Sequence, residues 1–388
     1  MQREGVCLVG YGELPNTLPE AEGLRSSFSY LPYLAEAVSL ALDNARLKKK
    51  DVDGFALVRL AFPADTPAVA EELGLELDWV QGVDCGGASA VLSVRRAADA
   101  IQLGQIEVAV CAAGIVRYRG HPFRGLPAYP TDNFMLPYGY GGPNSSFALT
   151  QQRHMAQYGT TLEQLGKIVV SFRQNAELNE NALLRSPLTL EDYLNSRTIS
   201  SPVRLYDCLR VCTGATAVVV ASERKAKQIT EHPIYLVSDA EKTNYQVDKP
   251  TPDRTVTGFA TLGEELFSKV SREEIDFAEI YDDYPIAVLM QLEDLGFCDK
   301  GKGGQFIEQH DITVHGDFPI NTGGGELSAG QAVGAGAMLH IVEAVRQLKG
   351  EAAARQLKKA RTGLVTGLGL LGFDLPIMCA AAMILQRG

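Results

Sequence analysis

Two patterns of hydrophobic residues alternate along the chain. Residues 5–10 and 106–112 are short apolar runs typical of buried strands. Residues 32–47 and 87–103 instead carry apolar side chains at three- and four-residue spacing, which is typical of amphipathic helices. This alternation predicts an α/β fold in which right-handed crossovers build a largely parallel sheet with helices on both faces.

The pattern then restarts in the second part of the chain. Here the same periods predict helices at 259–271, 285–295 and 328–348 and strands at 277–281 and 376–386, the second of which is preceded by the glycine-rich segment 362–369. In both parts a glycine-rich turn leads into a helix and then into an apolar strand, which indicates an internal duplication. We therefore expect two similar halves, residues 1–240 and 241–388.

The rhythm is interrupted inside the first half. Residues 117–150 lose all periodicity and are dominated by Gly, Pro and Tyr, and helices are expected after them at 150–158, 161–179 and 189–196. A loop of this length within a compact protein is usually functional. We expect residues of about 117–200 to form an insertion that contributes to a binding site.

Composition narrows the class of protein. A hydrophobic fraction of 46% fits a globular chain with a large core, and a formal net charge of -11 argues against a nucleic-acid partner. No apolar run is long enough to predict a membrane span, and the first residues lack the features of a signal peptide. The seven cysteines form no CxxC pair or His/Cys cluster, so we expect no disulfide framework, no metal site and a cytoplasmic location.

Four stretches in order give the sequence a specific resemblance. They are GGASAVLSVRRAADAIQLGQIEVAV at 86–110, SPVRLYDCLRVCTGATAVVVAS at 201–222, EIYDDYPIAVLMQLEDLGFCDKGKGG at 279–304 and NTGGGELSAGQAVGAGAMLHIVEAVRQLKG at 321–350. Together they resemble the thiolase family, and more narrowly its sterol-carrier/lipid-transfer branch.

The resemblance carries expectations about fold and partners. It implies a thiolase fold with five αβαβα layers, a loop-domain insertion, and central helices between the sheets of two similar halves. It also implies a homodimer formed through the first half and acyl-CoA chemistry in a pocket where the halves meet. The chain would bind no cofactor of its own, would use coenzyme A as co-substrate, and would work with a small zinc-ribbon/OB-fold partner subunit.

The expected nucleophile is displaced in this sequence. Thiolase chemistry needs a cysteine thiolate at a helix N-terminus, where the helix dipole lowers the thiol pKa. Counting back from Gly104, the position that matches the family's cysteine is Gly87, and Cys85 lies two residues earlier. Either Cys85 reaches the site through a different turn or the nucleophile has been lost. The family's second cysteine is also missing from the segment LVTGLGLLG.

Two further motifs depart from a thiolase. Tyr281 opens the sequence YDDY where the family has Asn or His, and a tyrosine there resembles the branch that cleaves hydroxyacyl-CoAs by a retro-aldol reaction. Gln331 replaces the histidine of the family's G-H-P motif and cannot act as a general base near neutral pH. Aldolase-like relatives have a second tyrosine at that position, so this chain matches neither template. His340 falls in mid-helix and is expected to be structural.

The remaining candidate residues form glycine-rich turns. Such turns expose backbone N–H groups that can bind a thioester oxygen or cap a helix. We assign to substrate or oxyanion binding the residues Gly87, Asn321, Gly323, Gly324, Gly325 and Gly367.

Three functions remain open at this point. The preferred one is thiolysis of a bulky or aromatic β-ketoacyl-CoA, such as a benzoylsuccinyl-CoA-type substrate, through an acyl group on Cys85. The first alternative is retro-aldol cleavage of a β-hydroxyacyl-CoA with Tyr281 as the acid/base. The second alternative is a non-catalytic subunit that binds acyl-CoA or lipid.

Overall fold

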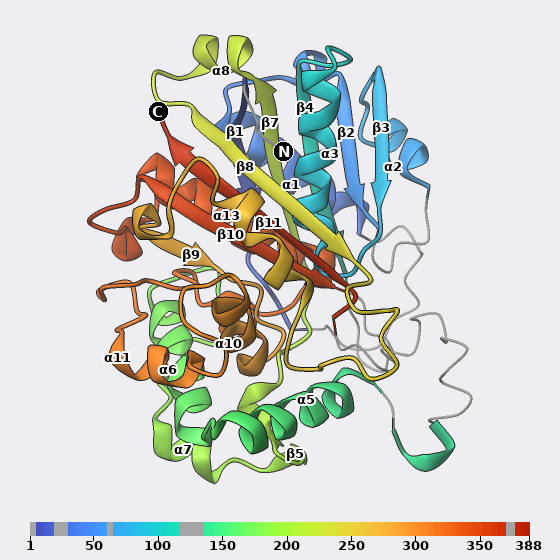
Figure 1. Cartoon of the computed structure of the whole chain (residues 1–388). Coiled ribbons are helices and arrows are strands. Elements are labelled where there is room, and N and C mark those ends of the chain that lie inside the picture. Colours follow the sequence, from blue (N-terminus) through green and yellow to red (C-terminus); the bar gives the residue numbers. More distant parts are fainter. Residues whose placement is uncertain (1–4, 19–29, 60–64, 117–135, 141, 370–376) are drawn as a thin grey trace.

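The computed structural model describes residues 5–18, 30–59, 65–116, 136–140, 142–369 and 377–388 (Figure 1). Nine strands form one sheet in the order β3-β2-β4-β7-β1-β8-β11-β10-β9. Of these, β3, β2, β4, β7 and β1 come from the first half and β11, β10 and β9 from the second, while β8 spans the expected division between them. In chain order the strands are β1 (Val6–Glu13), β2 (Gly54–Val58), β3 (Trp79–Val83), β4 (Val108–Ile115), β7 (Gly214–Ser222), β8 (Ile234–Thr243), β9 (Phe277–Glu279), β10 (Thr362–Gly369) and β11 (Cys379–Arg387).

The two halves meet along a short seam in this sheet. β1 and β8 pair through only two residue pairs, Cys7 with Tyr235 and Leu8 with Ile234. β8 then runs diagonally away from β1 and pairs along most of its length with β11 (Figure 1). The expected division at residues 240 and 241 falls inside β8, and that division stays a prediction.

The prediction of a largely parallel sheet is wrong. Only the outer parts are parallel, where β2 lies beside β3 and β4 and where β9 lies beside β10. The five remaining pairings are antiparallel. Apolar runs predict which segments are buried strands. They do not predict strand direction, which depends on the edge at which the preceding connection brings the chain back into the sheet. β7 returns from the long excursion after β4, and β11 pairs antiparallel with β10.

Helices cover the sheet in the layers that the family resemblance implied. α1 (Leu31–Asn44) packs on β1, β4 and β7, while α9 (Gly263–Leu266) packs on β8 and β11. Between these outer layers, α3 (Ser89–Gln102) and α13 (Gly334–Lys349) contact each other and strands from both halves. α13 is buried from Gly334 through Leu348. The prediction of an α/β fold is therefore confirmed, and its central helices are buried.

The excursion after β4 builds a helical layer below the sheet (Figure 1). Its helices are α5 (Gly142–Tyr158), α6 (Leu162–Glu177) and α7 (Leu190–Asn195), followed by the small hairpin of β5 (Thr198–Ser200) and β6 (Val203–Arg204). α10 (Pro285–Asp294) and α11 (Gly303–Gln309) from the second half pack against α6. The short helices α2 (Thr66–Glu72) and α8 (Glu223–Ile229) complete the first half. None of the helices in these described segments is long and apolar enough to cross a membrane.

Two predicted helices are divided in the structure. The segment 259–271 contains a 3-10 turn at Gly258–Thr261 and the four-residue α9 instead of one helix. α5 starts at Gly142, inside the segment expected to be a loop, of which residues 117–135 and 141 lie outside the described part of the chain.

The expected long helix at 328–348 is the more informative case. It is split into α12 (Gly325–Ala329) and α13 by a break that contains Gly330 and Val333, both with positive φ. In this break the Gln331 N–H donates to the carbonyl of Arg210 (2.9 Å), and the Gln331 carbonyl accepts from the Cys212 N–H (3.0 Å). Strand-like pairing with a distant segment therefore outcompetes the helical period and fixes the Gln331 backbone.

A buried ion network ties the central helix α13 to the rest of the protein. Glu343 accepts hydrogen bonds from Arg346 (2.6 Å) and from two nitrogens of Arg355 (2.9 and 3.0 Å). Arg346 also contacts Glu13 of β1 at 2.5 Å. Burial opposes the Glu343 charge, but Arg346 and Arg355 prevail and lower the pKa of Glu343 to about 2. The network therefore connects both halves through fully desolvated charges.

We expect Glu343→Gln to lower the free energy of unfolding by about 3–5 kcal/mol, because it leaves buried arginine charge uncompensated. Urea unfolding of the variant and wild type measures this difference. The wild-type contribution should be complete above the ordinary glutamate pKa and should disappear as the pH falls toward 2. Glu223→Gln, which removes the more exposed ion pair with Lys227, is the control and should change stability by about 1 kcal/mol or less. Equal losses in both variants would contradict the assignment.

Candidate active site

The turn before α3 lies against β10 of the second half. A Cβ atom on Gly369 of β10 would lie 2.0 Å from the carbonyl oxygen of Cys85, and one on Gly367 would lie 3.0 Å from the carbonyl oxygen of Gly87. Inside the turn, the Cys85 N–H donates to the Ser89 hydroxyl at 2.7 Å. The glycines of β10 thus let the N-terminus of α3 sit directly on the second-half sheet. Gly367 serves this close packing of backbone on backbone.

Tyr281 lies on the other side of this turn. Its N–H donates to the Thr366 hydroxyl at 3.0 Å, and its carbonyl accepts from Gln291 at 2.7 Å, so the residue is anchored at the end of β9. The ring itself packs on Gly87. A Cβ atom on Gly87 would lie 2.1 Å from Cζ and 2.3 Å from the hydroxyl oxygen of Tyr281. The phenol therefore occupies the space that any side chain at residue 87 would need.

The Tyr281 hydroxyl is surrounded by polar side chains. Asp283, Glu326 and Gln331 all interact with it. Burial and the negative charges of Asp283 and Glu326 raise the pKa of Tyr281 well above its ordinary value. The phenol consequently holds its proton at neutral pH.

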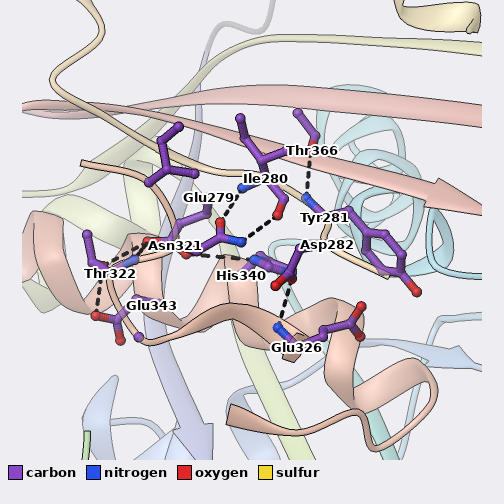
Figure 2. A network of polar contacts seen from close by, with 12 residues as sticks. Glu279, Ile280, Tyr281, Asp282, Asn321, Thr322, Glu326, His340, Glu343 and Thr366 are labelled. Carbon is purple, nitrogen blue, oxygen red and sulfur yellow. Dashed lines mark hydrogen bonds and ion pairs between the residues drawn. The ribbon is translucent and has the colours of Figure 1, made fainter. Parts of the chain in front are cut away.

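A buried network continues from Tyr281 into the core (Figure 2). Asp282 accepts hydrogen bonds from the N–H groups of Glu326 (2.7 Å) and Leu327 (3.1 Å) and so caps α12. His340 of α13 forms an ion pair with Asp282 at 3.2 Å and approaches Glu279 at 3.7 Å. Burial disfavours the imidazolium, but these carboxylates outweigh burial and raise the pKa of His340 to about 10. His340 is therefore a positive charge in the core.

This network answers whether a metal would fit. Asp282, Glu326 and His340 each place one potential ligand atom within 4.8 Å of the others. However, Asp282 already uses both carboxylate oxygens to cap α12 and pairs with His340. Protonated His340 supplies the positive charge that a cation would otherwise bring. We interpret these residues as a self-compensated network.

The glycine-rich loop is packed on the same network. The side chain of Asn321 is buried and accepts from the Ile280 N–H (2.6 Å) while donating to the Ile280 carbonyl (2.8 Å). Gly325 has φ +59, and a Cβ atom there would lie 2.2 Å from Asp282 Oδ2. The Gly323 carbonyl accepts from Asn179 at 2.9 Å, and Gly324 abuts Ala176. Asn321 thus positions the Tyr281 segment, and Asp282 occupies the anion-binding end of α12.

Cys85 lies beside a second cysteine. Its half-buried thiol is hydrogen-bonded with the thiol of Cys379 at the start of β11, and this bond lowers the pKa of Cys85 to about 7. The same contact, together with burial, raises the pKa of Cys379. Cys85 is therefore the described cysteine whose thiolate is most accessible near neutral pH.

The structure brings together part of the predicted site. Gly87, Tyr281 and Gln331 meet at the Tyr281 hydroxyl, and Gly367 supports the turn that carries Gly87. Asn321 and the glycines at 323–325 lie behind Asp282 instead of beside the phenol. Sequence reasoning missed the residues Asp282, Asp283, Glu326 and His340. The acidic pair inside YDDY and the glutamate that follows the glycines of NTGGGE could have indicated the three acids. Nothing in the sequence linked these acids to the histidine in the middle of the predicted helix.

Comparisons with known proteins agree with this geometry. Residues 240–387 match the family described as Thiolase C-terminal domain-like. The chain is 34% identical to the steroid side-chain-cleaving aldolase of Thermomonospora curvata, covering 90% of this chain and 95% of that protein. It is 33% identical to the 17-hydroxy-3-oxo-4-pregnene-20-carboxyl-CoA lyase of Mycobacterium tuberculosis, covering 84% and 88%.

A solved structure extends the similarity to the whole fold. The Ltp2-ChsH2(DUF35) aldolase superposes with a TM-score of 0.86 at 30% identity, covering 98% of this chain and 97% of that one. The fold, the buried central helices and these relatives lead to the same conclusion. The chain belongs to the thiolase family, in its sterol-carrier/lipid-transfer-like branch.

Proposed function

We propose that this protein cleaves a β-hydroxyacyl-CoA by a retro-aldol reaction, with Tyr281 exchanging protons with the substrate hydroxyl. In this reaction the hydroxyl loses its proton, the Cα–Cβ bond breaks, and the bonding electrons move into the thioester as an enolate. Protonation of Cα then releases a shorter acyl-CoA and a carbonyl compound. No acyl-enzyme forms, so the reaction needs no cysteine.

The observation that carries the proposal is the packing of Tyr281 on Gly87. Thiolysis through the family's usual position would require a cysteine at residue 87, but a Cβ atom there would overlap the Tyr281 ring. A phenol thus replaces the thiol at the N-terminus of α3. The aldolase and the lyase among the relatives support this substitution of one chemistry by another.

Thiolysis through Cys85 is the second candidate. Its thiol pKa of about 7 would give a substantial thiolate fraction at neutral pH. Against it, the Cys85 thiol pairs with Cys379, whereas Tyr281 occupies the helix N-terminus. For this second candidate the substrate would be a bulky or aromatic β-ketoacyl-CoA. If neither reaction occurs, the protein is a subunit that only binds acyl-CoA.

The proposal extends to the assembly. The similarity to a structure named for a complex with a DUF35 protein supports a small partner subunit, for which we propose the zinc-ribbon/OB-fold type. Homodimerisation through the first half, coenzyme A as the carrier of the substrate and a cytoplasmic location are parts of the same proposal. Kinetic experiments should therefore include the candidate partner.

We expect Tyr281→Phe to reduce kcat for β-hydroxyacyl-CoA cleavage by about 10²–10⁴-fold, because the group that exchanges the proton is lost. Cys85→Ala should stay within a few-fold of wild type. Cleavage of a panel of β-hydroxyacyl-CoAs, with detection of the shortened acyl-CoA, measures both. An acyl adduct on the Cys85 peptide that disappears when CoA is added, together with an inactive Cys85→Ala variant, would instead establish the thiolase. Tight binding of acyl-CoA without turnover would instead identify the protein as the non-catalytic binding subunit.

Gly87→Ala tests the packing itself. The added methyl group must displace the Tyr281 ring, so we expect kcat to fall by an order of magnitude or more. Combining Gly87→Ala with Tyr281→Phe should reduce kcat no further than Tyr281→Phe alone, since both changes act on one group. If the reduction in kcat of the double variant equalled the product of the two single reductions, residue 87 would act independently of Tyr281. Circular dichroism of each variant checks that the fold is retained.

A further inference from the structure

Two carboxyl groups from separate segments face the Tyr281 hydroxyl. Asp283 precedes α10 and is half-buried, whereas Glu326 lies in α12 and is fully buried. The Glu326 carboxyl is held against α13, because a Cβ atom on Gly336 would lie 2.3 Å from Glu326 Oε1. Figure 2 shows the Tyr281 hydroxyl and the Glu326 carboxyl at the same end of the network. A phenol flanked by two acids is therefore built into the site.

Hydrogen-bond stoichiometry limits how these three groups are protonated. Within the described residues, neither Glu326 oxygen has a hydrogen bond of ordinary geometry. The Tyr281 hydroxyl has a single proton to donate, and an ionised carboxylate can only accept. Two ionised carboxylates facing one phenol would leave a buried negative charge without a donor, which is strongly unfavourable. One additional proton removes the conflict, because the protonated carboxyl can donate to the phenol oxygen.

The surrounding charges favour Glu326 as the group that holds this proton. Burial and the charge of Asp283 raise the pKa of Glu326 well above its ordinary value, and Asp282 adds to the effect while His340 opposes it. Burial raises the pKa of the more accessible Asp283 to about 7, with Asp282 again adding to the rise. The positive charge of His340 is shared with Asp282 and Glu279. Asp283 is thus the first of the pair to ionise as the pH rises.

We propose that Asp283 and Glu326 hold a single proton between them in the resting site, on Glu326, and that Asp283 is the relay through which this phenol takes a proton from the substrate and returns one. The inference deepens the proposed function, on which its catalytic part rests. A protonated Tyr281 cannot accept the substrate proton unless another base accepts its own proton, and Asp283 is that base. The inference also assigns a role to two acidic residues that stand beside Gln331, a side chain that cannot be a general base.

The relay balances protons over one turnover. Tyr281 donates its proton to the Asp283 carboxylate as it accepts the proton of the substrate hydroxyl. The Cα–Cβ bond then breaks and leaves an enolate. Tyr281 donates a proton to Cα, and Asp283 returns its proton to Tyr281, so the site regains its starting state. Glu326 stays protonated throughout and stabilises the phenol oxygen by donating a hydrogen bond to it. Asp283 and Glu326 act through Tyr281 and are positioning residues.

Infrared titration of the substrate-free protein tests the shared proton without any assumption about the reaction. At slightly alkaline pH we expect wild type to show a protonated carboxylic-acid band that is absent from Glu326→Gln. In Asp283→Asn this band should disappear at a lower pH than in wild type, because the like charge that raises the Glu326 pKa has been removed. Absence of any difference between wild type and Glu326→Gln would overturn the proposal.

Asp207→Asn is the matched control for these measurements. Asp207 accepts a hydrogen bond from the buried hydroxyl of Tyr193 at 2.6 Å in the helical layer. Burial raises the pKa of Asp207 to about 6, so this is also a carboxyl with a raised pKa beside a tyrosine. It lies on separate elements from Tyr281. The variant should alter its own infrared band and leave the Glu326 band and the pH profile of cleavage in place.

The pH profile of kcat tests the catalytic role of the pair. In wild type the rate should rise as Asp283 ionises near pH 7 and should fall at high pH as Glu326 loses its proton. Asp283→Asn should lose the rise and reduce kcat by about 10²-fold or more with little change in KM. Glu326→Gln should keep the rise and lose the fall, since a glutamine still donates. Asp283→Glu should restore part of the lost rate if a carboxylate at this position is what matters.

The outcomes separate the two levels of the proposal. If the infrared bands behave as expected but no hydroxyacyl-CoA is cleaved, the carboxyl pair exists and the proposed function is wrong. If cleavage depends on Tyr281 but both variants keep the wild-type pH profile, the proposed function holds and the relay is overturned. Binding of a divalent cation to this subunit without its partner, if it is lost in Glu326→Gln, would also overturn the relay, because the carboxyls would then be metal ligands.

Discussion

The close packing of the Tyr281 ring on Gly87 is the constraint on which the site depends. It requires a residue without a side chain at the start of α3, and it brings the end of β9 onto the N-terminus of a helix from the other half of the chain. Gly367 and Gly369 of β10 allow an equally close contact on the other side of this turn, because the backbone at Cys85 and Gly87 packs directly on their backbone. One contact between the halves thus shapes the site and leaves no space for a side chain at residue 87.

Desolvated charge is the second organising feature. The centre of the protein contains Asp282, Glu326 and His340 beside the phenol, and the Glu343 cluster lies further along α13. Each cluster compensates its own charge, either with histidine or with arginine, since isolated charges in a low-dielectric core are very unfavourable. Glu326 forms no salt bridge within the described residues, and burial and the charge of Asp283 raise its pKa well above the ordinary value, so it is the acid that keeps a proton.

Much of the fold and part of the site could be predicted from the sequence. Apolar runs located β1, β4 and β11, and helical spacing located α1, α3 and α10, because burial of one face imposes these periods locally. The YDDY and G-Q-A segments identified Tyr281 and Gln331 as the departures from a thiolase. Strand direction and the break before α13 were missed, since both depend on which distant segment supplies the pairing partner. Gln331, for example, pairs with the backbone of 210–212.

The sequence by itself determined the periodic elements and the family resemblance, and the resemblance predicts that Gly87 lies at the position of the family's cysteine. Only the tertiary structure decided what that glycine is for, because the ring that fills its space comes from a residue nearly two hundred positions later. The same holds for the ionisation of Asp283, Glu326 and His340. Their pKa values arise from burial and from neighbours on other segments, and neither quantity exists until the chain has folded.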